Sequence, residues 1–76
     1  MSVELIQVVF FENGGFARVT FAPVGRSRIR IIEVAYSDDE NAEDGLWTVL
    51  NLNDLTREEM QFLVRQLDLS EVGLNF

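Results

Sequence analysis

The segment of residues 37–45 carries five carboxylates, which could bind a metal ion or support acid–base catalysis. Hard cations such as Ca²⁺ prefer several oxygen ligands, but the segment lacks the ordered positions and terminal glutamate of an EF-hand loop. Paired carboxylates support acid–base catalysis where apolar surroundings raise one pKa, and this segment has few apolar residues. We interpret residues 37–45 as an acidic surface loop without a metal site, and its candidate acidic surface consists of Asp38, Asp39, Glu40, Glu43 and Asp44.

All six basic residues of the chain are arginines. Side chains alternate between the two faces of a strand, so Arg18, Arg28 and Arg30 are predicted to cluster on one face of a sheet. Neighbouring like charges repel, so the cluster requires neutralising carboxylates from Glu4, Glu12, Glu33 or the acidic loop, or an anionic partner. Guanidinium groups form paired hydrogen bonds with carboxylate or phosphate. The candidate interface combines these arginines with apolar neighbours: Val9, Phe11, Phe16, Arg18, Arg28 and Arg30.

Residue types that commonly perform catalysis are missing. There is no histidine to act as a base near neutral pH, and there is no cysteine nucleophile. The glycine-rich stretch Asn13-Gly14-Gly15 has the flanks of a hairpin turn and does not match a phosphate-binding loop. We therefore expect no catalytic residues, no cofactor and no metal, and predict that the protein is not an enzyme.

The charge balance narrows the classes of partner. Thirteen acidic and six basic residues give a formal net charge of −7, which disfavours general nucleic-acid binding and adsorption to anionic membranes. The N-terminal stretch lacks the pattern of a signal peptide, and no apolar run approaches the roughly 18 residues of a membrane span. These features, with the absence of cysteine, predict a cytoplasmic protein.

Seventy-six residues with 47% hydrophobic content predict one small folded domain, residues 1–76. The strongest local signal is Asn13-Gly14 between the β-prone runs Val3–Phe11 and Phe16–Phe21, which predicts a hairpin with a two-residue type I′ turn. This turn also sets the register, because a one-residue slip exchanges the two faces of a strand. It places Ile6, Val8 and Phe10 on the core face with Ala17, Val19 and Phe21, and places Leu5, Gln7, Val9 and Phe11 on the opposite face.

A second turn is predicted at Ala22-Pro23-Val24-Gly25, because proline and glycine suit a type I turn. The third strand, Arg26–Tyr36, then places Ile29 opposite Val19 and Ile31 opposite Ala17. Its apolar alternation changes parity, so we predict a β-bulge near Ile31-Ile32 that returns Val34 and Tyr36 to the core side. A short fourth strand is expected at Leu46–Leu52, and its sequence does not indicate which of its two faces looks inward.

The best-marked element is a helix from Arg57 to Leu67. Thr56 and Glu59 match the capping box, which satisfies backbone N–H groups at a helix start. The apolar stripe of Met60, Leu63, Val64 and Leu67 has helical spacing and is predicted to pack on the sheet. A second apolar row lies roughly opposite this stripe and completes the candidate interface: Leu55, Phe62 and Leu69. The alternative is that a mobile tail of residues 70–76 covers this row.

These elements predict an α+β fold, an antiparallel β-meander of three to four strands with one C-terminal helix on one face (β-β-β-β-α). One helix covers one face of a sheet, so the other face is free to bind a partner. We hypothesise a small, acidic, non-enzymatic protein–protein interaction or regulatory module, oligomeric (for example a homodimer) or part of a larger assembly. The alternatives are an acidic nucleic-acid mimic that inhibits an enzyme, as small phage proteins do, and direct nucleic-acid binding by the arginine face.

Overall fold

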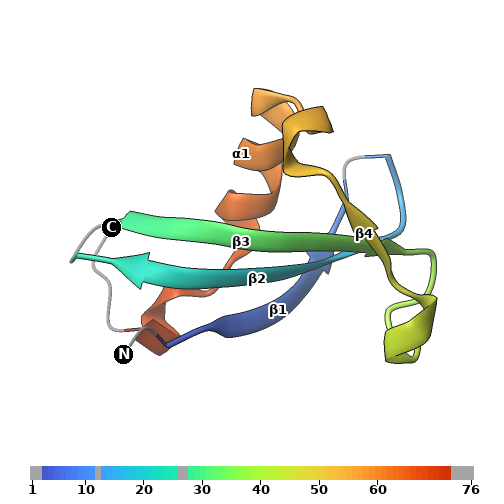
Figure 1. Cartoon of the computed structure of the whole chain (residues 1–76), viewed down its shortest axis with the longest axis horizontal. Helices are drawn as coiled ribbons and strands as arrows, with labels where there is room; N and C mark the ends of the chain where they lie inside the picture. The colour runs from blue at the N-terminus through green and yellow to red at the C-terminus, as the bar shows by residue number, and fades with distance from the viewer. Residues whose placement is uncertain (1–2, 12, 26–27, 73–76) are drawn as a thin grey trace.

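The computed structural model describes residues 3–11, 13–25 and 28–72. Its first two strands, β1 (Leu5–Phe10) and β2 (Phe16–Val24), form an antiparallel hairpin (Figure 1). The Phe11 N–H donates to the Gly15 carbonyl at 3.1 Å, and the Gly14 N–H donates to the Phe11 carbonyl at 3.0 Å. Gly14 and Gly15 have positive φ angles, whereas Asn13 does not. The predicted type I′ turn is therefore wrong, because the loop is one residue longer and uses its glycines for the left-handed positions.

The longer loop shifts the hairpin register by one residue. Val8 lies opposite Arg18, and Val9 lies opposite Ala17. Because strand side chains alternate, this shift exchanges the predicted faces of β1. The core-facing residues are Leu5, Gln7, Val9 and Phe11, and the outward-facing residues are Ile6, Val8 and Phe10.

The third strand, β3 (Arg28–Ser37), pairs antiparallel with β2. The predicted turn at 22–25 is wrong, because β2 continues through Pro23 to Val24, which pairs with Arg28; residues 26–27 lie outside the described ranges. Ile29 and Ile31 do face the core, but opposite Pro23 and Phe21 instead of Val19 and Ala17. The predicted bulge is confirmed. Thr20 pairs with Glu33 and Phe21 pairs with Ile31, so Ile32 is the extra residue. The bulge puts Val34 and Tyr36 on the core side.

A short fourth strand, β4 (Thr48–Leu50), completes a sheet in the order β1-β2-β3-β4. It is shorter than predicted and lies between two 3-10 turns, η1 (Asp44–Leu46) and η2 (Leu52–Asp54). Leu50 pairs with Val34 and packs against the core, so the face of β4 that carries Val49 points outward.

The helix α1 (Arg57–Gln66) begins as predicted, with its capping box formed. The Thr56 hydroxyl accepts from the Glu59 N–H at 3.0 Å, and the Glu59 carboxylate accepts from the Thr56 N–H at 2.8 Å. Leu63 and Leu67 are buried, whereas Met60 and Val64 are half-buried. The predicted tail begins as a 3-10 helix, η3 (Leu69–Val72), and its last four residues, 73–76, lie outside the described ranges.

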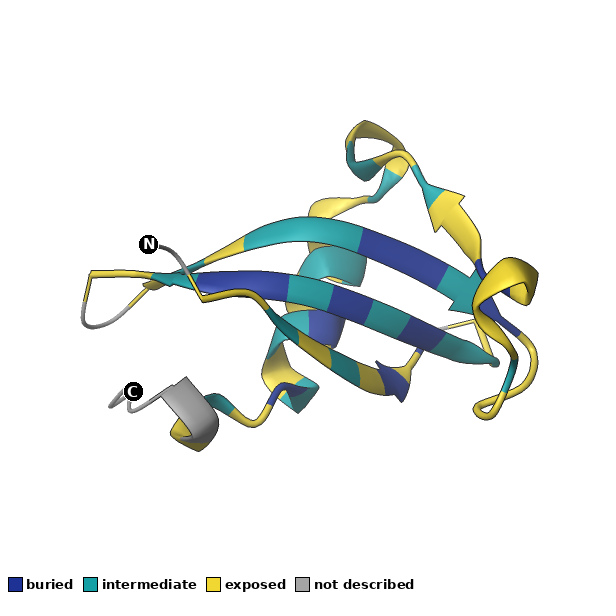
Figure 2. Cartoon of the chain, turned by 60° about the horizontal axis from the view of Figure 1, so that its bottom comes forward, coloured by how far each residue is buried: buried dark blue, intermediate teal, exposed yellow. Residues whose placement is uncertain are grey.

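The core lies between the sheet and α1, in two layers (Figures 1 and 2). The predicted α+β fold of four antiparallel strands and a C-terminal helix is confirmed. Figure 1 shows α1 on one face of the sheet and the η1 turn on the opposite side. The core cluster consists of Val9, Phe11, Ala17, Val19, Phe21, Val34, Leu63 and Leu67.

Candidate functional site

The outward face of β1 carries a row of large apolar side chains. Ile6, Val8 and Phe10 remain 62%, 41% and 63% exposed. Alternate residues of a strand are about 7 Å apart on the same face, so the three side chains form a continuous strip. The ring of Phe10 packs against that of Phe16, with centroids 5.6 Å apart. We call Ile6, Val8 and Phe10 the β1 strip.

Arg18 lies next to the β1 strip on β2, opposite Val8. Its guanidinium forms an ion pair with Asp44 at 2.9 Å and lies over the Trp47 ring, 5.2 Å from the centroid. The Trp47 indole N–H donates to the Ala42 carbonyl, which fixes the ring on the outer face. The prediction that the acidic loop supplies a neutralising carboxylate is confirmed for Arg18. Because Asp44 is almost fully exposed, the pair adds little stability and mainly orients Arg18.

The predicted cluster of three arginines is wrong. Arg28 and Arg30 are exposed on the same outer face as Arg18, but Arg18 lies opposite Ala35, while Arg30 lies opposite Ala22. Four positions along β2 correspond to about 14 Å. Because β2 continues to Val24, the second turn falls later than predicted and carries Arg28 and Arg30 away from Arg18.

The apolar part of the predicted interface is also changed by the register. Val9 and Phe11 belong to the buried core and offer no binding surface, so these two assignments are wrong. Phe16 is half-buried against Phe10. Leu55 and Leu69 pack against the core, which leaves Phe62, 37% exposed, as the exposed member of that row.

The acidic surface is exposed as predicted, and several of its groups make local contacts. The Asp39 carboxylate accepts from the Asn41 N–H, while the Asp39 N–H donates to the Ser37 hydroxyl. The Tyr36 hydroxyl donates to the Asp38 carboxylate at 2.6 Å, and this bond, with smaller effects of partial burial and the Asp38 charge, raises the pKa of Tyr36. Within the described ranges no three acidic side chains are grouped closely enough to hold a metal ion.

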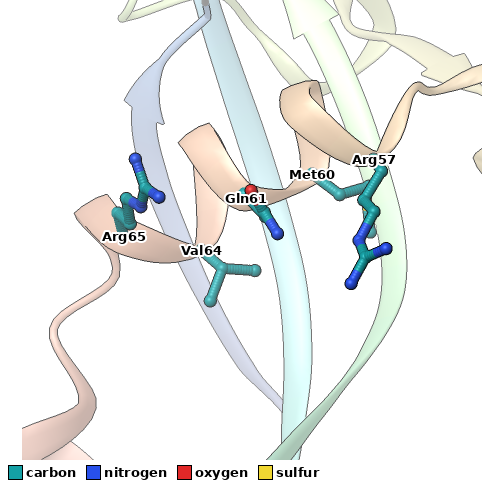
Figure 3. A pocket seen from close by; sticks show the side chains of 5 residues that line it. All are labelled: Arg57, Met60, Gln61, Val64 and Arg65. Carbon is teal, nitrogen blue, oxygen red and sulfur yellow. The ribbon is translucent and has the colours of Figure 1, made fainter.

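A shallow groove of about 390 Å³ runs along one flank of α1 (Figure 3). Arg57 and Arg65 lie at its two ends, eight residues and thus about 12 Å apart along the helix. Half-buried Met60 and Val64 form its apolar part, which explains why these members of the predicted core stripe are not fully buried. Gln61 completes the lining.

Comparisons with protein-family models, with curated proteins and with solved structures found no match to this chain. In the described ranges no helix is long and apolar enough to cross a membrane. The β1 strip was missed by sequence reasoning, because Ile6, Val8 and Phe10 were predicted to be core. Its signal in the sequence was the alternative register permitted by Gly14-Gly15.

Proposed function

We propose that this protein is a small, non-enzymatic protein–protein interaction module that binds its partner through the β1 strip. The observation that carries the proposal is the row of three exposed apolar side chains on β1. Single exposed apolar residues are normal on protein surfaces, whereas contiguous apolar patches with polar rims are characteristic of interaction sites.

The composition around the β1 strip supports this proposal. Phe10 provides a large aromatic side chain that packs against Phe16 of the neighbouring strand, and Arg18 is held at the rim by Asp44 and Trp47. Aromatic residues and arginine are enriched in protein interfaces. A partner with an apolar pocket would bury Phe10, and aromatic anchors of this kind contribute much of the binding energy in many complexes.

Charge predicts how the interaction responds to salt. The chain has a net charge of −7, but Leu5–Phe10 contains no charged residue. Burial of an uncharged apolar surface is little affected by salt, whereas contacts between exposed charges weaken as ionic strength rises. Binding through the β1 strip should therefore persist at high salt.

Affinity capture from nuclease-treated lysate of the source organism tests the proposal, with elution by rising salt. Three tagged proteins are compared: wild type, Phe10→Ser and Val49→Ser. Val49 is a matched control, because it is 60% exposed on the outward face of the opposite edge strand. We expect wild type and Val49→Ser to retain one partner at high salt, and Phe10→Ser to lose it.

Two results would contradict the proposal. Equal capture by all three proteins would show that the β1 strip is not the binding surface. Release of a nucleic-acid-handling enzyme from all three at modest salt would instead support the acidic nucleic-acid mimic, which should depend on charge.

A further inference from the structure

The hydrogen-bonding pattern of β1 leaves backbone groups at an open edge. In an antiparallel pair, alternate residues bond to the neighbouring strand and the others point away from it. Phe11 bonds to Gly15, so the odd-numbered residues of β1 face β2 and Ile6, Val8 and Phe10 face the free edge.

The side chain of Gln66 provides independent support for this assignment. Its Oε1 accepts from the Phe10 N–H at 2.9 Å, and its Nε2 donates to the Phe10 carbonyl at 2.7 Å. Gln66 thus occupies the position that the backbone of another strand would take beside Phe10. Within the described ranges, no comparable bond reaches the edge-facing groups of Ile6 or Val8.

The open part of β1 lacks the features that usually prevent strand addition. Edge strands are commonly protected by charged side chains, proline, bulges or short length. Leu5–Phe10 has six residues, no charge and no proline, and its pairing with β2 has no register shift. The other edge strand, β4, has three residues.

We propose that the β1 edge pairs antiparallel with β1 of a second copy of the chain, around a twofold axis at Gln7. This inference rests on the proposed function and names the partner of the β1 strip. The register places Ile6 of each copy opposite Val8 of the other, so the two residues with open groups satisfy each other through four N–H···O=C bonds. An axis at Val8 would instead place Ile6, which lies inside β1, opposite Phe10, whose groups Gln66 already occupies.

Side-chain chemistry favours the same register. Ile6 and Val8 of both copies lie on one face of the joined sheet, so the two β1 strips form one apolar surface. Two chains of net charge −7 repel each other, which favours contact through an uncharged segment. Glu4 precedes β1, so the paired segments end at Leu5 and leave Gln66 in its place beside Phe10 of the second copy. The two Glu4 residues are then about 20 Å apart, beyond a Debye length of about 8 Å.

Sedimentation velocity over a range of protein concentrations tests the proposal, with wild type, Val8→Pro and, as a control on the opposite edge strand, Val49→Ser. Proline removes the edge-facing N–H without removing a bond to β2, so an edge strand tolerates it; circular dichroism checks that the sheet is retained. We expect wild type and Val49→Ser to dimerise, and Val8→Pro to weaken the dimer about tenfold or more, because the symmetric pair loses two hydrogen bonds. A dimer unaffected by Val8→Pro would contradict the proposal.

Cysteine cross-linking tests the register without depending on that variant. The chain has no cysteine, so Ile6→Cys and Val8→Cys proteins can be oxidised separately and as a mixture. Directly opposed residues lie about 5.5 Å apart at Cα, within disulfide range. The mixture should form a mixed disulfide dimer in excess of either single sample.

Failure of the dimer proposal can be distinguished from failure of the proposed function. A wild-type chain that stays monomeric at every concentration would overturn self-pairing. If Phe10→Ser still lost its partner in the capture experiment, the β1 strip would bind another protein and the proposed function would stand. Cross-linking that is equal in all samples would overturn the register.

Discussion

Replacing Val8 and Val9 in turn by alanine tests the register on which the β1 strip depends. Val9 is 8% exposed among the core side chains, whereas Val8 is 41% exposed on the outer face. Each substitution removes two carbon atoms, worth about 0.8 kcal/mol each when buried, and the cavity left at Val9 adds to this cost. We expect Val9→Ala to lower the free energy of unfolding by about 2 kcal/mol and Val8→Ala by less than about 1 kcal/mol.

The pair controls for strand propensity, because the same change is made at adjacent positions of one strand. Unfolding by urea, followed by the fluorescence of Trp47, the single tryptophan, gives both free energies. All samples are compared at one low protein concentration, because self-association would add to stability. A larger loss for Val8→Ala would refute the reasoning, since it would place Val8 in the core, as the two-residue turn predicted.

Three further predictions concern local contacts. Gly15→Ala should destabilise the fold by at least about 1 kcal/mol more than Gly14→Ala. Both glycines have positive φ, but a Cβ at Gly15 would lie 2.6 Å from the Tyr36 hydroxyl, whereas nothing lies within 4 Å of a Cβ at Gly14. Equal losses of stability in urea unfolding would contradict this contact. Absorbance titration of Tyr36, the single tyrosine, should give a pKa above 10.0 that Asp38→Asn lowers. Because the pKa of Tyr36 is higher in the folded than in the unfolded protein, the protonated hydroxyl stabilises the fold at pH values below the unfolded pKa of about 10. This contribution is lost as the pH rises through the pKa of the folded protein. A titration curve of Tyr36 unaffected by Asp38→Asn would show that the bond does not cause the shift. Thr56→Ala should cost about 1 kcal/mol, because it removes the helix cap, and unchanged unfolding would show that the cap contributes nothing.

Elements specified by neighbouring residues were predictable from the sequence. The start of α1 follows from Thr56 and Glu59, whose side chains and backbone groups bond within three residues of each other. The bulge at Ile32 was likewise visible as a change of parity in the apolar pattern of one strand. Both features depend on short-range chemistry, so no tertiary information was needed.

The hairpin register was not predictable in the same way. Both faces of β1 are apolar, since Leu5, Val9 and Phe11 alternate with Ile6, Val8 and Phe10, and the pattern alone therefore does not select a face. In the observed register, β1 forms hydrogen bonds with residues that are far away in the sequence. Gln7 exchanges two hydrogen bonds with the backbone of Asp68, 61 residues away, and Gln66 binds Phe10 across 56 residues.

The candidate site likewise combines features that could be predicted from the sequence with features that depend on the strand register. Pairing of Arg18 with the acidic loop could be expected from charge alone. The position of Arg30 could not, because it depends on where the second turn falls, and β2 runs through Pro23 to Val24 before that turn. The β1 strip became visible only once the register was known.

The most direct test of the central claim is an NMR titration that follows individual side chains. The labelled protein is titrated with the partner retained in the capture experiment or, for self-association, studied at rising protein concentration. We predict that the methyl and ring resonances of Ile6, Val8 and Phe10 shift or broaden, while those of Val49 stay unchanged. Changes confined to the acidic segment 38–44 or to Met60 and Val64 in the α1 groove would contradict the claim that this protein binds through the β1 strip.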